Sequence, residues 1–366
     1  MPASLGTVVR EWGRIGLIGF GGPPAHVALL RELCVERRGW MDARGFEDAN
    51  AACGLLPGPA STQLAIFCAH RIAGTRGALV GGAAFVLPGL VMVLALAALT
   101  LQDDPPAWVL GAAAGAGAAV VTVVAQTGIK LVRASVTGEH AVRRAAYLLA
   151  GAAATVALGP AVVLVLLLAG LIELALQRAP VGHGLATLPA LVWMAFKVGA
   201  LSYGGGFVIV PLMQADAVAV NGWLSEAEFL NAVALGQLTP GPVVQTVAAV
   251  GYGAAGVWGG LLASVVAFAP SFVLVIALAS RFERLRHNAS ARAFLDGAGP
   301  AAVGAILGAA VLLTAGVTEP WQIAVLAAAA VALLTRRVGV VAVLAAAALV
   351  GVGVALGGGP LPGPGR

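Results

Sequence analysis

Long apolar stretches separated by short polar loops make up almost the whole chain, six in each half. In the first half they run roughly over 4–36, 46–71, 75–101, 107–129, 143–158 and 160–177. In the second half they run roughly over 187–220, 226–255, 256–280, 293–316, 320–335 and 338–356. Apolar stretches of this kind are typical of membrane helices, so the pattern predicts an all-α polytopic membrane protein.

Two stretches in each half are interrupted by residues that an ordinary helix does not tolerate. The interruptions are Gly21-Gly22-Pro23-Pro24, Pro57-Gly58-Pro59, Gly204-Gly205-Gly206 and Pro240-Gly241-Pro242. A broken backbone inside a membrane must be buried in protein or face a polar cavity. The piece from 46 to 56 would be about 16 Å long as a helix, about half of the hydrocarbon core. Each Pro-Gly-Pro stretch therefore suits a re-entrant hairpin, which enters and leaves the membrane on one side.

The two halves repeat each other at an offset of 183 residues, with one position lost beyond about residue 68. Glycines, prolines and tryptophans that match at a fixed offset are hard to obtain by chance in an alanine-rich chain. The matched pairs include Arg14 and Lys197, Gly39 and Gly222, Trp40 and Trp223, and Gly74 and Gly256. We expect two repeats, 1–180 and 184–356, followed by a disordered tail at 357–366.

The charges on equivalent loops predict that the two repeats have opposite orientations in the membrane. Loop 102–106 carries Asp103 and Asp104, whereas its counterpart carries four arginines between 281 and 292. Loop 130–144 is basic, whereas its counterpart carries only Glu319. Because Lys and Arg gather on the cytoplasmic side, we expect inverted-topology repeats, each of about five transmembrane helices plus one re-entrant hairpin.

The composition agrees with a membrane location and narrows the classes of function. Of the 366 residues, 60% are hydrophobic and 10% are charged, against about 25% charged in soluble domains. The net charge of +5 would suggest nucleic acid in a soluble protein, but the positive-inside rule accounts for it here. We therefore expect the lipid bilayer, and no nucleic acid, as a partner. The three cysteines have no metal-ligand spacing and no phosphate-binding P-loop is present, so we expect no metal, no cofactor and no ATP-driven pumping.

The interruptions are also the expected substrate site. Paired broken helices in inverted halves mark transporter sites near the midplane, and their N-termini expose N–H groups that suit anions. Arg14 and Lys197 are candidate cations, His26 and Glu173 are candidate proton carriers, and Asp216 is expected in water at a segment end. We place the anion in the gap between the two Pro-Gly-Pro tips. The expected substrate-binding residues are Arg14, Gly21, Gly22, Pro23, His26, Pro57, Gly58, Pro59, Ser61, Gln63, Lys197, Gly204, Gly205, Gly206, Pro240, Gly241, Pro242 and Gln245.

Several alternatives stay open at this point. The breaks could be kinks for close packing, Arg14 and Glu173 could reach the membrane surface, and His26 could be a packed neutral histidine. A membrane-embedded enzyme would need a cluster of His, Asp and Glu, and the sequence shows none at suitable spacing, so no catalytic activity is expected. Another alternative is a packing or assembly subunit without transport. Such a subunit has no reason to retain four helix breaks that have a structural cost. A homodimer also stays open, and the residues alone indicate an anion transporter.

Five stretches resemble the chromate ion transporter family in its long, two-domain form. They are GLIGFGGPPAH at 16–26, LLPGPASTQ at 55–63, Phe85 to Pro88, SYGGG at 202–206 and LTPGP at 238–242. The resemblance covers nearly the whole chain. It implies export of chromate from the cytoplasm across the plasma membrane, linked to the membrane potential or to protons, and hence chromate resistance. Sulfate is a related tetrahedral oxyanion, and uptake or exchange of sulfate or another oxyanion is the alternative function.

Overall fold

The structure, a computed structural model, describes most of the chain as helices joined by short turns. The described residues are 3–20, 22–54, 56, 58–102, 105–135, 141–158, 165, 168–169, 188–202, 209–278, 289–335 and 338–362. Within these ranges there is no strand, and the expectation of an all-α chain is confirmed.

The described helices follow one another in two runs that correspond to the two halves. The first run is α1 (Leu5–Ile18), α2 (Pro23–Arg31), the π-helical turn η1 (Glu32–Arg37), α3 (Ala43–Cys53), α4 (Ala60–Thr100), α5 (Ala107–Ser135) and α6 (Ala141–Leu158). The second run is α8 (Leu188–Leu201), α9 (Ile209–Gln214), η3 (Ala215–Val220), α10 (Glu226–Leu238), η4 (Val243–Gln245), α11 (Thr246–Leu278), α13 (Ala289–Leu313), η6 (Thr314–Gly316), α14 (Pro320–Leu334) and α15 (Val340–Leu356).

The boundaries and the irregularities of the first run recur in the second. Helices α1 and α8 both have 14 residues, and the π-helical turns η1 and η3 both have six. The backbone leaves helical angles at Gly74 in α4 and at Gly256 in α11, with φ of 64° and 59°. Gly58 and Gly241 also share positive φ, at 123° and 105°. Glycine adopts these angles without the strain that a Cβ would cause, so the backbone repeats the pattern that the sequence predicts.

Four described helices are long and apolar enough to cross a membrane. They span Ala60–Thr100, Ala107–Val132, Val243–Leu278 and Asp296–Gly316, and shorter apolar helices accompany them. Helix α4 is kinked at Ala73 and Gly74, where the backbone leaves helical geometry, and this kink lies at the boundary that we expected between the stretches 46–71 and 75–101. The multi-pass helical architecture is therefore confirmed.

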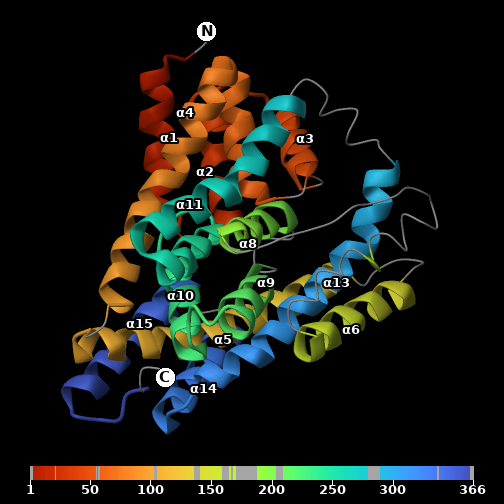
Figure 1. Ribbon diagram of the computed structural model, residues 1–366. Coiled ribbons are helices and arrows are strands. Elements are labelled where there is room, and N and C mark those ends of the chain that lie inside the picture. The colour runs from red at the N-terminus through yellow and green to blue at the C-terminus, as the bar shows by residue number, and fades with distance from the viewer. Residues whose placement is uncertain are drawn as a thin grey trace.

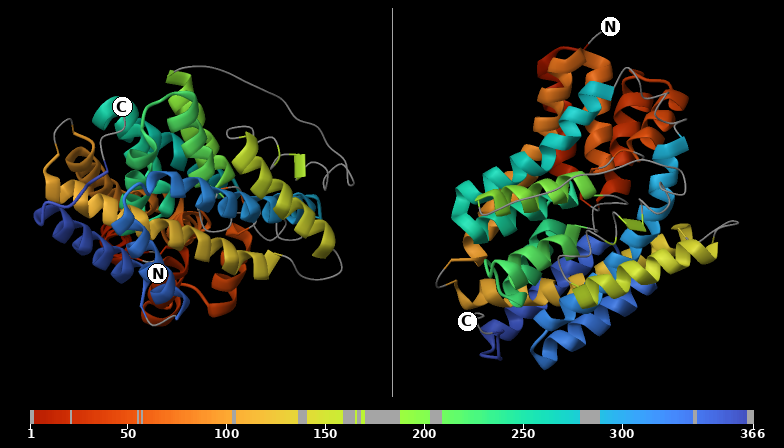
Figure 2. Two further views of the ribbon diagram at one scale, coloured as in Figure 1. Left: turned by 90° about the horizontal axis from the view of Figure 1, so that it is seen from below. Right: turned by 45° about the vertical axis from the view of Figure 1, so that its right-hand side comes forward.

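The helices pack in two groups that α4 and α11 connect. Helix α5 packs on α13, α14 and α15, and α6 packs on α13, so that these five helices lie side by side in the lower part of Figure 1. Helices α1, α2 and α3 lie at the opposite end with the start of α4, as the right-hand view of Figure 2 also shows. Helices α4 and α11 pack on each other between the two groups.

Glycines allow the closest helix contacts. A Cβ added to Gly111 in α5 or to Gly351 in α15 would stand less than 3.0 Å from the carbonyl oxygen of the other residue. Gly16 lies in the same way against the carbonyl of Phe85, and its repeat counterpart Gly199 lies against the carbonyl of Ala267. Small residues let helix backbones approach within lipid, which explains much of the high glycine content.

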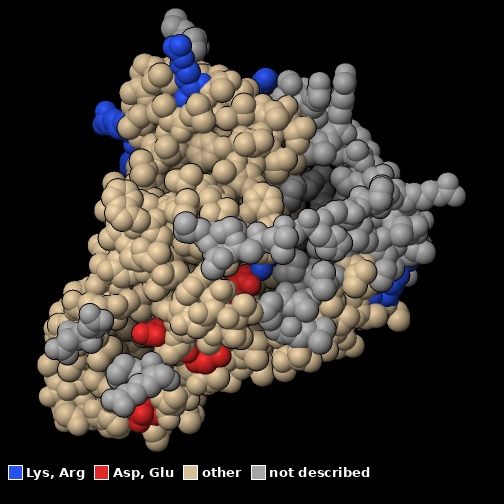
Figure 3. Space-filling model, viewed as in Figure 1, with Lys and Arg blue, Asp and Glu red and all other residues tan. Residues whose placement is uncertain are grey.

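The surface is largely apolar, as lipid requires. Large exposed side chains include Val91, Val265 and Leu349. Figure 3 shows a broad uncharged area between Lys and Arg near the N-terminal end and Asp and Glu lower on the same face.

The C-terminal tail differs from the expected disorder over its described part, because Trp321 Nε1 donates to the carbonyl of Pro360 at 2.9 Å.

Candidate functional site

The two Pro-Gly-Pro breaks each bind the end of a helix from the opposite half. The Gly241 amide donates to the carbonyl of Gly19, just beyond α1, at 3.1 Å. The Gly58 amide donates to the carbonyl of Ser202, just beyond α8, also at 3.1 Å. The two bonds are related by the repeat, so each half holds the broken backbone of the other in place.

His26 is buried and both of its ring nitrogens have partners. Nε2 lies 2.8 Å from the carbonyl oxygen of Gly19, which can only accept, so Nε2 carries the proton. Nδ1 lies 3.1 Å from Ser61 Oγ, within hydrogen-bond distance. The Phe85 ring packs edge-on against the imidazole, with ring centroids 5.0 Å apart. This arrangement fixes the imidazole between α1 and α4.

The helices that follow the Pro-Gly-Pro breaks begin with free amides. Helix α4 follows Pro59, and the amides of Thr62 and Gln63 both donate to the Pro59 carbonyl. The N–H groups of Ala60 and Ser61 have no acceptor among the described residues. Such amides, at the positive end of a helix dipole, favour anions.

The second break has the same arrangement. The turn η4 follows Pro242, and the amide of Gln245 donates to the Pro242 carbonyl. The N–H groups of Val243 and Val244 have no acceptor in the described part of the chain.

The start of α2 differs from the expectation that it exposes free amides. Pro23 and Pro24 occupy its first two positions and have no N–H to offer. The next two amides, those of Ala25 and His26, both donate to the Gly22 carbonyl. The glycine break at the end of α1 therefore shapes the site without donating to an anion.

Two glutamines support the Pro-Gly-Pro breaks from inside the protein. Gln63 packs against Gly58 and Gln245 packs against Gly241, although the two glutamines are one position apart in the repeat, in which Gln63 corresponds to Thr246. Gln245 also donates from Nε2 to the carbonyl of Val86. The carbonyl of Pro240 packs closely on Gly89 of α4, where a Cβ would stand less than 3.0 Å away.

A cavity of about 320 Å³ lies between the first glycine break and the second Pro-Gly-Pro break. Among its described lining residues, none is acidic. The lining residues are Gly22, Pro23 and Pro24; Val123, Gln126, Thr127, Lys130 and Leu131 of α5; Gly236 and Gln237 of α10; Thr239, Gly241 and Val243; and Val340 and Val341 of α15. Gly58 does not line it, so this cavity is not a gap between the two Pro-Gly-Pro tips, where we expected the anion.

The polar groups of this cavity are mostly donors. Lys130 Nζ is exposed and donates to Gln126 Oε1 at 2.9 Å. Gln126 Nε2 donates to the carbonyl of Leu333 at 2.8 Å. Gln237 Nε2 is buried and has no acceptor among the described residues. An ammonium and side-chain amides are thus among the groups of the residues that line the cavity, and donors of these kinds suit an oxyanion.

The structure does not bring the two candidate cations into similar surroundings. Arg14 is exposed on α1, whereas Lys197 is buried. Lys197 Nζ lies 2.6 Å from Asp216 Oδ2 in η3, so these residues form a buried ion pair. The expectation that Asp216 lies in water is wrong, because its carboxylate is the partner of the lysine.

Some expected site residues lie outside the described part of the chain. They are Gly21, Pro57, Gly204, Gly205, Gly206 and Glu173.

The sequence analysis does not single out Lys130 or Gln237, which line the cavity. It uses the basic loop 130–144, which begins at Lys130, only to predict the orientation of the repeats. One available signal was the helical spacing of Lys130, Thr127 and Gln126, which places polar groups on one side of an otherwise apolar helix.

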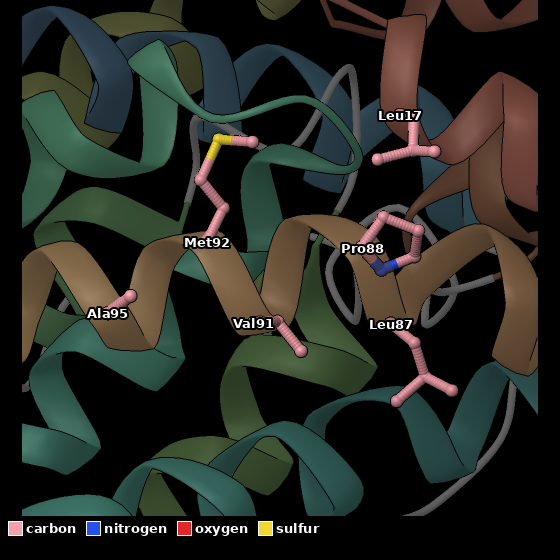
Figure 4. Close-up of a pocket in the computed structure, with 6 residues that line it drawn as sticks. All are labelled: Leu17, Leu87, Pro88, Val91, Met92 and Ala95. Atoms are coloured by element: carbon pink, nitrogen blue, oxygen red, sulfur yellow. The ribbon is translucent and has the colours of Figure 1, made fainter.

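A second hollow, of about 580 Å³, is a purely apolar groove and not an anion site. Figure 4 shows its six lining residues, which are Leu17 of α1 and Leu87, Pro88, Val91, Met92 and Ala95 along α4. Pro88 lacks the N–H that would continue the helical bonding of α4. No lining side chain can donate to an oxyanion.

Comparisons with known proteins agree with this architecture. A family model described as Chromate transporter matches residues 6–174 and 189–352. The chain is 31% identical to the chromate transport protein of Cupriavidus metallidurans, over 95% of this chain and 93% of that one. It is 32% identical to the probable chromate transport protein of Synechococcus elongatus, over 85% and 84%. It is 28% identical to the chromate transport protein of Pseudomonas aeruginosa, over 87% and 82%. No solved structure matches the chain. The chain therefore belongs to the chromate transporter family, in its two-domain form.

Proposed function

We propose that this protein is a secondary transporter that exports chromate from the cytoplasm across the plasma membrane and so confers chromate resistance. Family membership supports chromate as the substrate, because three relatives that match over most of their length carry chromate transport in their names. The observation that carries the site is the cavity between Gly22 and Gly241, which is lined by Lys130, Gln237 and Val243.

The donors of this cavity match the chemistry of a tetrahedral dianion. Chromate presents four oxygens that accept hydrogen bonds and carries two negative charges. Lys130 supplies a charge-assisted bond, while Gln237 and Val243 supply neutral donors from other elements. Lys130 compensates one of the two negative charges of chromate. The other charge needs no second cation in the site, because the membrane potential helps to move the dianion.

The membrane potential favours the outward direction. An inside-negative potential contributes about 2.3 kcal/mol per charge per 100 mV, hence about 4.6 kcal/mol for a dianion. At 1.4 kcal/mol per factor of ten, this drives an outward gradient of about 2,000-fold. Export at such a potential needs no proton carrier. The fixed bonds of His26 agree with this, since neither ring nitrogen faces a free partner.

The two halves, 1–180 and 184–356, act in this proposal as inverted repeats that rock around the substrate. The exchanged bonds from Gly58 to Ser202 and from Gly241 to Gly19 support a two-fold relation between them. On this topology Lys130 lies toward the cytoplasm, so the cavity would receive chromate from inside the cell.

Cysteine labelling tests the inverted topology. The native Cys34, Cys53 and Cys68 are buried, which leaves a low background. In intact cells, an impermeant maleimide should label a cysteine placed at Gln102 and should reach one placed at Arg286 only after the membrane is opened. Labelling of both from the same side would contradict inverted repeats.

Transport in oriented vesicles tests the function. Inside-out vesicles that contain the protein should take up radioactive chromate when their interior is made positive, whereas vesicles without it should not. Sulfate in excess should reduce this uptake if both tetrahedral oxyanions use one site. Chromate uptake only into right-side-out vesicles, or labelled sulfate uptake that chromate does not affect, would contradict chromate export.

A further inference from the structure

The cavity that Lys130 lines is larger than a tetrahedral oxyanion needs. Its volume of about 320 Å³ gives room for about ten water molecules, at roughly 30 Å³ each. Chromate has only five non-hydrogen atoms, all bonded to one centre, so it fills at most about half of this space. What else the cavity can hold depends on the chemistry of its lining.

The cavity follows helix α5 over about two turns. Its lining residues on this helix are Val123, Gln126, Thr127, Lys130 and Leu131. From Val123 to Leu131 the helix rises about 12 Å. Val123 is buried, whereas Lys130 is exposed. The cavity therefore has an inner end at Val123 and an outer end at Lys130.

Helix α15 adds two valines to the inner end. It packs along α5, as Figure 1 shows, and two backbone contacts fix an antiparallel register. These contacts join Gly111 to Gly351 and Gly115 to Ala347. The same register brings Val340 and Val341, which line the cavity, beside Val123 and away from Lys130. We call Val123, Val340 and Val341 the valine end.

Most polar side chains of the lining already have partners within the protein. Thr127 and Thr239 donate their hydroxyls to carbonyls one turn earlier, at 2.9 and 3.0 Å. The side-chain amide of Gln126 also donates to a backbone carbonyl. Gln237 Nε2 is buried and has no acceptor among the described residues, and Lys130 supplies the charge. Few polar groups in a largely apolar cavity are typical of sites that hold one polar headgroup and an apolar body.

The charge of the lining matches a monoanion. Among the described lining residues, Lys130 is the one cation and none is acidic. A ligand with one negative charge is therefore compensated fully, whereas chromate keeps a second charge without a partner in the cavity. A charge without a partner is costly where the surroundings are apolar.

We propose that this cavity also binds organic sulfonates, which combine one negative charge with an apolar body. The three oxygens of the sulfonate group lie at Lys130 and Gln237, and the alkyl chain extends along α5 to the valine end. The sulfonate group shares its tetrahedral geometry with chromate. The inference rests on the proposed function in one respect, because both use Lys130 as the cation that holds the anion.

A series of alkanesulfonates tests this site. Purified full-length protein in lipid nanodiscs binds radioactive butanesulfonate, which unlabelled sulfonates of one to four carbons then displace, and empty nanodiscs give the background. Each added methylene should strengthen binding about fourfold, the equivalent of about 0.8 kcal/mol. Equal displacement by methanesulfonate and butanesulfonate would overturn the proposal, because no apolar wall would then contact the chain.

Substitutions separate the two ends of the cavity. Val340→Ser combined with Val341→Ser should reduce the gain from methanesulfonate to butanesulfonate at least about fivefold. Val350→Ser, at an exposed position of the same helix outside the cavity, should keep the full gain. Lys130→Gln should weaken all the sulfonates by one common factor. The gain is a ratio within one protein, so it does not depend on how much of a variant is folded. An unchanged gain in the double variant would also overturn the proposal.

Chromate transport by the Lys130→Gln variant separates this inference from the proposed function. If chromate transport is independent of Lys130 while the sulfonates show the fourfold gain and lose affinity in Lys130→Gln, the sulfonate site is supported and the export proposal fails at this cavity. If Lys130→Gln weakens chromate transport but chain length has no effect on sulfonate binding, the sulfonate site is refuted and the export proposal is supported.

Discussion

Gly89→Ala should displace the second Pro-Gly-Pro break and reduce chromate transport. A Cβ at position 89 would meet the carbonyl oxygen of Pro240 at least 1 Å inside the 3.4 Å at which ordinary van der Waals contact begins. Gln245 Oε1 lies equally close on the same side, so the added methyl has no room without a backbone shift. A shift of this size breaks the 3.1 Å bond from Gly241 to Gly19. Overpacking of this kind costs about 1–3 kcal/mol.

The assay is chromate uptake by inside-out vesicles, with the amount of protein in the membrane measured in parallel. A loss of about 1 kcal/mol in the occupied site corresponds to about a fivefold weaker apparent affinity, which we expect as a minimum. Gly353→Ala is the control, because a Cβ there meets nothing within 4 Å. Wild-type affinity in Gly89→Ala at normal expression would refute the claim that the Pro240 carbonyl and α4 position this break.

Two further substitutions test buried polar groups. His26→Leu should lower the stability in detergent by about 1–3 kcal/mol, because it removes one of the two donors to the Gly19 carbonyl and leaves the Ser61 hydroxyl without its partner. His26→Gln should keep the wild-type pH profile of transport, and a flattened profile would indicate that the histidine carries a proton. Lys197→Met should cost about 3–5 kcal/mol by leaving the Asp216 carboxylate unpaired in the interior, and adding Asp216→Leu should recover most of it. Equal expression and equal unfolding midpoints for the single and double variants would show that the ion pair does not stabilise the fold.

The sequence predicts the repeated breaks well because glycine and proline mark backbone exceptions directly. Gly58, Gly241, Gly74 and Gly256 all adopt positive φ, which other residues avoid, so their positions are informative without any knowledge of contacts. The same reasoning does not show which backbone N–H groups remain without an acceptor. At α2 the two prolines that mark the break also remove the amides that an anion would use.

The side chains of the site are not predictable in this way, because they come from elements far apart in sequence. Lys130 on α5 and Gln237 on α10 meet at the cavity only through packing of the two halves. The ion pair of Lys197 and Asp216 likewise has no motif. The exposure of Arg14 could have been predicted, because Trp12 and its helical neighbours form a buried stripe of α1 that does not include position 14.

The most direct test of the account is the effect of Lys130 on chromate affinity in inside-out vesicles. Lys130→Gln should raise the apparent KM at least about tenfold, since a charge-assisted bond contributes about 1.5–3 kcal/mol. Lys130→Arg should restore much of the affinity, and Arg44→Gln, which removes an exposed charge elsewhere, should leave it unchanged. A chromate KM in Lys130→Gln equal to that of wild type would contradict the proposal that this cavity binds the transported anion.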